Sequence, residues 1–182
     1  MKACATLVPL LLAGAAMAHP LDEVVQGAYL TLLPGAVRLE LDLTPGELVA
    51  DALLQAIDAN VDRTIAEPEA WNYAERVLLQ STLLLDGAPV SWRLQGVDMP
   101  AYADLRLQGA TLKIHAFASR ADRSGKHTLR YENHYQPAAS QNIANVFLQP
   151  GARWRYEVAG QQHGPDGRVL DVDYVSAHRL RQ

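Results

Sequence analysis

The sequence has a single cysteine, few aromatic residues and no excess of positive charge. Cys4 is the only cysteine among 182 residues and lies close to the N-terminus, so a chain that has lost this segment contains no thiol. Disulfides, thiolate metal sites and cysteine nucleophiles are thereby excluded. The formal net charge of −4, from 16 Lys and Arg against 20 Asp and Glu, predicts no basic face. Nucleic acid is therefore not an expected partner.

Long apolar runs and catalytic motifs are also lacking. The main apolar run, within residues 5–15, is shorter than the roughly 20 residues that a membrane-spanning helix needs, and no later stretch comes closer. Neither Gly-x-Ser-x-Gly nor His-Glu-x-x-His occurs. Since no arrangement of serine, histidine and acid singles out a nucleophile and its base, we expect no enzyme, with a hydrolase as a distant alternative.

Residues 1–18 have the pattern of a signal peptide. Lys2 precedes the apolar run, and Ala16-Met17-Ala18 provides the small residues that signal peptidase requires. Cleavage after Ala18 leaves one domain at residues 19–182 without a transmembrane segment. The leader is of a bacterial type, which predicts a periplasmic or secreted protein.

Most of the remaining chain alternates between apolar and polar residues. Val37, Leu39, Leu41 and Leu43 share one face of a strand, and the Pro34-Gly35 turn predicts a hairpin formed by residues 29–33 and 37–43. Further strands are expected at 83–85, 90–94, 105–107, 112–116, 127–131, 143–148, 154–158 and 169–174. Short strands separated by turns are typical of a β-sandwich, here expected to be immunoglobulin-like.

The segment from about 44 to 79 departs from this alternation and predicts two helices. Residues 44–47, Thr-Pro-Gly-Glu, have the form of a capping box. The apolar residues that follow are spaced as on one helical face: Ala50, Leu53, Leu54 and Ile57. A second helical face extends over residues 71–78. The β-sandwich is therefore expected to carry a helix–loop–helix insertion.

The twelve residues between the helices, 58–69, contain oxygen donors at the spacing of a calcium loop. Asp58, Asn60 and Asp62 occupy positions one, three and five, and Glu69 occupies position twelve. Position seven contributes only a backbone carbonyl, here that of Thr64. Calcium binds six to eight oxygens at about 2.3–2.6 Å, which a loop of this length supplies. The sequence therefore predicts a weak calcium site.

This insertion resembles an EF-hand with its flanking helices. Ile65 stands where the motif has a hydrophobic residue facing the core. The departure is Arg63, where the motif has a glycine with positive φ. That conformation costs a non-glycine residue about 1–2 kcal/mol, which weakens the site without removing its ligands. A solvated acidic loop that no longer binds calcium is the alternative.

A second candidate metal ligand is His19, which cleavage after Ala18 places at the new N-terminus. Its amine and imidazole together suit copper or nickel, and Pro20 blocks the next backbone nitrogen. A second histidine would come from His115, His127, His134, His163 or His178, none of which lies at a ligand spacing from another. His134 is expected at the end of a strand, where it would contact a partner or metal, or bond to backbone.

Several features together resemble the extracytoplasmic domain that precedes the membrane segments of HupE/UreJ-type and related nickel/cobalt transport proteins. They are residues 19–23 (His-Pro-Leu-Asp-Glu), the strand and cap at 39–46, the insertion at 58–78 and, more loosely, residues 133–148. The resemblance implies an accessory or interaction module linked to transition-metal handling. Those proteins continue into the bilayer where this sequence stops at Gln182, so a role in transport would require a separate membrane protein of metal transport as partner. A periplasmic copper- or nickel-binding protein that uses His19 is the alternative function.

Overall fold

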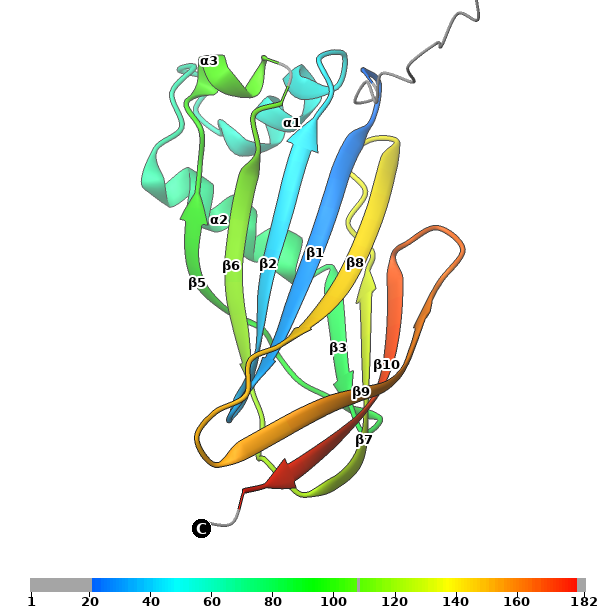
Figure 1. Ribbon diagram of the computed structural model, residues 1–182. Coiled ribbons are helices and arrows are strands. Elements are labelled where there is room, and N and C mark those ends of the chain that lie inside the picture. The colour runs from blue at the N-terminus through cyan, green and yellow to red at the C-terminus, as the bar shows by residue number, and fades with distance from the viewer. Residues whose placement is uncertain (1–20, 108, 180–182) are drawn as a thin grey trace, which may run out of the picture.

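A computed structural model describes residues 21–107 and 109–179, which form two five-stranded sheets (Figure 1). The first sheet has the order β5-β6-β2-β1-β8, with bounds β1 Val24–Leu33, β2 Ala36–Pro45, β5 Arg93–Asp98, β6 Leu112–Ser119 and β8 Ser140–Leu148. The second has the order β4-β3-β7-β10-β9, with bounds β3 Ser81–Leu85, β4 Ala88–Pro89, β7 Gly125–Asn133, β9 Trp154–His163 and β10 Val169–His178. The prediction of a mainly β protein is confirmed, and its two sheets are consistent with a β-sandwich.

The alternating leucines build the core between the sheets. Leu39, Leu41 and Leu43 on β2 are fully buried, as is Leu30 on β1. β1 and β2 form the expected antiparallel hairpin, and Gly35 at its turn has a φ of 77° that favours glycine. Burial of one face of each strand keeps the register fixed, because a one-residue slip would expose every leucine.

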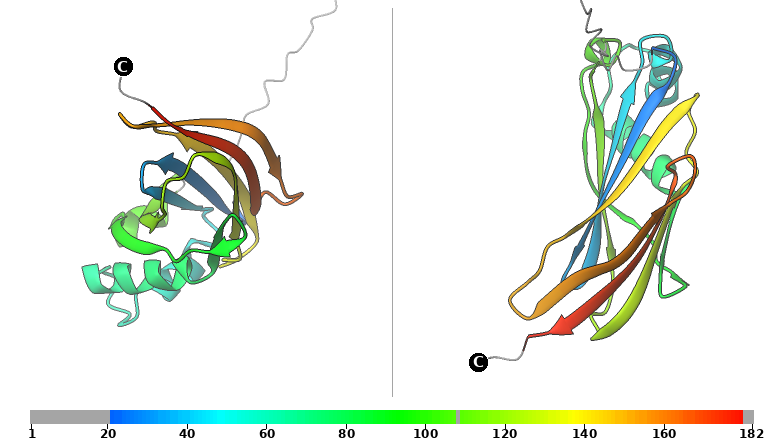
Figure 2. Two further views of the ribbon diagram at one scale, coloured as in Figure 1. Left: turned by 90° about the horizontal axis from the view of Figure 1, so that it is seen from below. Right: turned by 45° about the vertical axis from the view of Figure 1, so that its right-hand side comes forward.

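One edge strand of the first sheet, β8, comes from late in the chain. β8 lies beside β1 and runs parallel to it, with Val24 opposite Ser140 and Leu32 opposite Leu148. The next strand, β9, turns away and joins the second sheet beside β10. Figure 2 shows the two sheets crossing over one another, with β8 and β9 connected at the end of the molecule that lies away from the helices.

The insertion contains the two predicted helices, which are α1 (Ala50–Ile57) and α2 (Glu67–Leu78). α1 lies with the short helix α3 (Tyr102–Leu105) at one end of the sheets, at the top of Figure 1. α2 packs against β5 and buries Tyr73, Ala74 and Val77. The loop between α1 and α2 is thereby held at the edge of the β-sandwich.

The predicted capping box at 44–47 is wrong. Thr44 and Pro45 still belong to β2, where they pair with Val25 and Val24, and the Thr44 hydroxyl lies 2.7 Å from that of Thr111. α1 begins only at Ala50, without a side-chain cap. Strand pairing therefore satisfies the polar groups that the sequence pattern assigned to a helix start.

Two strand predictions are also wrong. The segment predicted as a strand at 105–107 follows a helical turn instead, with Leu105 as the last residue of α3 and fully buried. In the run predicted as a strand at 90–94, residues 90–92 are not part of a strand. Residues from Arg93 onward form β5, which pairs with β6 in the other sheet.

The predicted signal peptide and His19 lie outside the described residues. Within 21–107 and 109–179, no helix combines the length and apolar character needed to cross a membrane.

Candidate functional site

The loop between α1 and α2 adopts an unusual backbone conformation. Val61 and Arg63 have φ values of 61° and 64°, in the left-handed region that non-glycine residues rarely adopt. Each costs about 1–2 kcal/mol, and more for a β-branched residue such as Val61. Such a conformation persists only where surrounding contacts favour it over the alternatives.

Those contacts come from the side chains predicted to bind calcium. Asp58, only 4% exposed, accepts the backbone N–H of Asp62 through Oδ1 (3.2 Å) and that of Arg63 through Oδ2 (2.9 Å). Asn60 Oδ1 also accepts the N–H of Asp62, at 2.9 Å. Asp62 Oδ1 in turn accepts the N–H of Thr64, at 2.7 Å. The side chains of Asp58 and Asn60 therefore meet at one backbone amide, and Asp62 continues the turn.

Glu69 connects the two ends of the loop from the first turn of α2. Its Oε1 accepts the N–H groups of Ala59 (2.9 Å) and Asn60 (3.3 Å), and its Oε2 accepts that of Ala66 (3.0 Å). The bond to Ala66 also caps α2. Glu69 thus faces the same side of the loop as Asn60, at the position that the sequence assigned to a bidentate ligand.

The side chains of the two remaining residues of the motif, Ile65 and Arg63, lie outside the group of oxygen atoms. Ile65 is half-buried and packs against the hydrophobic core, as the sequence predicted. Arg63 lines an open hollow together with Glu47, Asp51 and Arg106. Its charge therefore has acidic neighbours outside the loop.

The loop is held by hydrogen bonds rather than by grouped carboxylates. Within the described part of the chain, no three His, Asp or Glu side chains lie close enough together to hold a metal ion. A cation entering this loop would compete with backbone N–H groups for the oxygens of Asp58, Asp62 and Glu69. Any binding would be correspondingly weak.

The described histidines lie apart from this loop. His134 follows β7, is half exposed, and has its Nδ1 3.7 Å from Glu132 Oε1. His163 Nε2 lies 2.8 Å from the carbonyl oxygen of Ala144. The ring of His178 packs edge-on against Trp154. None of these contacts groups a histidine with other metal ligands.

His127 has an acid and a serine nearby, the combination that a hydrolase would need. Its Nδ1 lies 2.8 Å from Asp86 Oδ2, but its Nε2 lies 2.8 Å from the carbonyl oxygen of Arg123. Ser176 Oγ donates to the same carbonyl, so the serine and the histidine share an acceptor and do not bond to each other. This arrangement does not activate a nucleophile.

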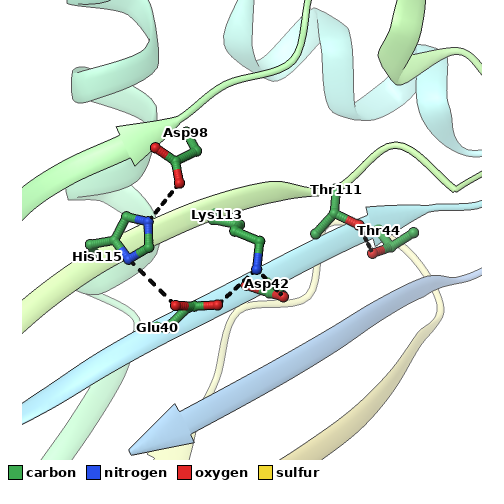
Figure 3. A network of polar contacts seen from close by, with 7 residues as sticks. All are labelled: Glu40, Asp42, Thr44, Asp98, Thr111, Lys113 and His115. Carbon is green, nitrogen blue, oxygen red and sulfur yellow. Dashed lines mark hydrogen bonds and ion pairs between the residues drawn. The ribbon is translucent and has the colours of Figure 1, made fainter.

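A polar network that the sequence did not predict covers the outer face of the first sheet (Figure 3). His115 on β6 has its Nε2 2.9 Å from Asp98 Oδ2 on β5 and its Nδ1 3.8 Å from Glu40 Oε2 on β2. Lys113 donates to Glu40 at 2.7 Å and to Asp42 at 3.1 Å. These contacts tie three neighbouring strands together, and each carboxylate already has a nitrogen partner.

Asp42 is the acid of this network whose carboxyl group is affected most by burial. Burial raises the pKa of its carboxyl above the usual 3.8, and Glu40 adds to the rise, while Lys113 opposes it. Its Oδ1 is buried and has no hydrogen-bond partner among the described residues. The folded state therefore disfavours the charged form of Asp42, despite the lysine beside it.

The unmodified protein should lose stability as Asp42 ionises with rising pH, and replacing Asp42 by asparagine should remove that loss. Because the folded-state pKa is raised, the folded protein binds a proton more tightly, and that stabilisation disappears as the pH rises through the folded-state pKa. We expect the unfolding free energy of Asp42→Asn, relative to that of the unmodified protein, to rise between about pH 3.5 and 6.5. Urea unfolding at both pH values measures the difference, and a difference independent of pH would contradict this account.

No protein-family model matches the chain, and no curated protein matches it significantly.

Proposed function

We propose that the protein is a periplasmic or secreted calcium-binding module that acts as an accessory or interaction partner and has no enzymatic activity. The observation that carries the proposal is the loop at 58–69, whose left-handed residues are held in place by Asp58, Asn60 and Asp62. Side-chain oxygens of four residues, Asp58, Asn60, Asp62 and Glu69, lie along this short segment, and these are the residue types that an EF-hand-like site uses. Calcium would fix α1 and α2 relative to each other at the edge of the β-sandwich.

The affinity should be in the range of extracellular calcium modules. The hydrogen bonds of Glu69 to Ala59 and Asn60 must give way to the ion, and Arg63 adds positive charge to the loop. Dissociation constants of about 10⁻⁴–10⁻³ M still allow occupancy outside the cytoplasm, where calcium is abundant.

The partner that we propose is a membrane protein of metal transport. Support for it comes from the resemblance to the extracytoplasmic domains of HupE/UreJ-type and related nickel/cobalt transport proteins. We also infer that the β-sandwich is immunoglobulin-like, because its first strand pairs with β2 on one side and with the late strand β8 on the other. A bound calcium ion would then order the end of the domain that carries the helices.

Millimolar calcium should raise the melting temperature of the protein, and Glu69→Gln should abolish that rise. Glu69 supplies two of the expected ligand oxygens, and glutamine supplies only one without charge. Glu67→Gln is the matched control, because Glu67 begins the same helix and is exposed. The measurement is the difference in melting temperature between calcium and chelator, recorded for each protein.

This difference separates calcium binding from the structural role of Glu69, since loss of its bond to Ala66 lowers stability in both solutions alike. We expect a rise of a few degrees for the unmodified protein and for Glu67→Gln. Identical melting curves of the unmodified protein in calcium and in chelator would refute the proposal.

A further inference from the structure

Charge is divided unevenly along the chain. Residues 21–111 contain fourteen Asp and Glu and five Lys and Arg, whereas residues 112–179 contain six and nine. The first of these segments includes the helices and their acidic loop, and the second includes the whole of β7, β9 and β10. The net charge of −4 therefore conceals an uneven distribution, in which residues 112–179 carry nine positive and six negative charges.

The start of β7, the start of β9 and the end of β10 lie at the end of the molecule opposite α1 and α3, at the bottom of Figure 1. Backbone contacts gather the chain segments there. Arg179 after β10 donates its N–H to the carbonyl of Arg153 before β9, at 2.8 Å. The N–H of His178 donates to Ser124 Oγ, in the connection that leads into β7. Three separate parts of the chain therefore meet at this end.

Five exposed cations from these segments form what we call the basic end. They are Arg123, Lys126, Arg153, Arg155 and Arg179. None of them takes part in an ion pair within the part of the chain that the structure describes, whereas Arg130 and Arg168 do.

Two of the acids near the basic end lie close to other side chains. Asp122 lies 2.7 Å from the buried Arg120, and Asp86 lies 2.8 Å from His127. Glu157 on β9 and Asp173 on β10 are exposed acids without an ion-pair partner among the described residues, and Asp173 lines a hollow together with Lys126. Five unpaired positive charges therefore face two unpaired negative charges.

We propose that the basic end docks on a membrane surface rich in anionic lipid headgroups. Each Lys or Arg that approaches such a surface is attracted by its negative potential, and the attraction falls off within a Debye length of roughly 8–10 Å. The acidic helical end lies at the opposite pole, so the surface field orients the molecule with the basic end inward. Trp154, half-buried beside His178, adds the type of side chain that favours the headgroup region.

A membrane fits this charge distribution better than a soluble polyanion does. A polyanion in solution can approach from any side and meets the negative net charge of the whole molecule. A planar surface meets only one end, and the basic end gathers its cations at one pole of an elongated β-sandwich (Figure 2). The proposal does not depend on calcium binding, because the loop at 58–69 lies at the other end of the molecule.

Sedimentation with lipid vesicles tests the proposal. The chain is used as isolated, with its N-terminus recorded by mass spectrometry. It should bind vesicles of about 30% phosphatidylglycerol in phosphatidylcholine at least tenfold more tightly than vesicles of pure phosphatidylcholine, at about 50 mM salt. The pure vesicles also measure any binding through a retained apolar leader.

The variant Arg153→Gln/Arg155→Gln should lose about tenfold or more of the binding to anionic vesicles. The control Arg93→Gln/Arg106→Gln removes the same net charge at exposed positions away from the basic end and should stay within about twofold of the unmodified protein. Equal losses in the two variants would overturn the proposal. So would equal binding to both kinds of vesicle, or binding to soluble polyphosphate without binding to anionic vesicles.

Discussion

Replacing Arg120 by methionine is expected to lower the free energy of unfolding by about 3–5 kcal/mol. The side chain of Arg120 is 5% exposed, and its Nη2 lies 2.7 Å from Asp122 Oδ1. Asp122 also accepts the N–H of Gly35 (2.8 Å) and the hydroxyl of Tyr156 (2.9 Å). The substitution would leave a nearly buried carboxylate without its cation, in a network that joins the β1–β2 turn to the second sheet. Urea unfolding followed by circular dichroism measures the loss.

The double variant Arg120→Met/Asp122→Asn separates the unpaired charge from the lost packing, because asparagine removes the charge and keeps an acceptor oxygen beside Gly35 and Tyr156. If the buried carboxylate causes the loss, removing both charges should restore most of the stability. Arg120 also stacks over the rings of Tyr156 and Tyr174, at 5.1 and 5.8 Å from their centroids, and methionine retains only part of that contact. Arg123→Met, at an exposed neighbouring position, should change stability by less than about 0.5 kcal/mol. A double variant as unstable as Arg120→Met would contradict the explanation by charge.

Local pattern was sufficient to predict the strands whose one face is buried. The alternation of Val37, Leu39, Leu41 and Leu43 predicted β2, and the Pro34-Gly35 turn predicted its hairpin with β1. The same reasoning failed for Leu105, because a short apolar run has the same local appearance in a strand and in a buried helical turn. The parallel pairing of β1 with β8 could not be predicted from local pattern, because neither segment indicates which strand it pairs with more than a hundred residues away.

The candidate sites also differ in whether local sequence was enough to predict them. The loop at 58–69 was identified because all its oxygen donors lie within twelve residues, so their spacing alone suggests a common centre. The network of His115, Glu40 and Asp98 was missed, because it depends on the register of three strands. The basic end was missed for a similar reason. Its cations stand at strand ends that only the folded chain brings together, and each is unremarkable in its own part of the sequence.

The placement of α2 on the sheets depends on a buried pair of tyrosine hydroxyls. Tyr73 on α2 and Tyr135 after β7 are 2% and 8% exposed, and their hydroxyl oxygens lie 2.6 Å apart. Their rings meet edge to face at 6.1 Å. Burial is the main cause that raises the pKa of Tyr73, and the neighbouring Tyr135 raises it further. The pair therefore stays protonated and hydrogen-bonded at neutral pH. This contact links the helix that carries Glu69 to the second sheet.

Tyr73→Phe should therefore lower the free energy of unfolding by about 1–3 kcal/mol, because it leaves the Tyr135 hydroxyl buried without its partner. Tyr73→Phe/Tyr135→Phe removes both polar groups and should be more stable than the single variant. Tyr102→Phe serves as the control, since Tyr102 is only half-buried and its hydroxyl makes no hydrogen bond within the described residues; it should change stability by less than about 0.5 kcal/mol. Urea unfolding of the four proteins gives the comparison. A single variant as stable as the unmodified protein would show that the hydroxyl pair does not hold α2 in place, and the attachment of this helix would then rest on its buried apolar side chains, which include Ala74 and Val77.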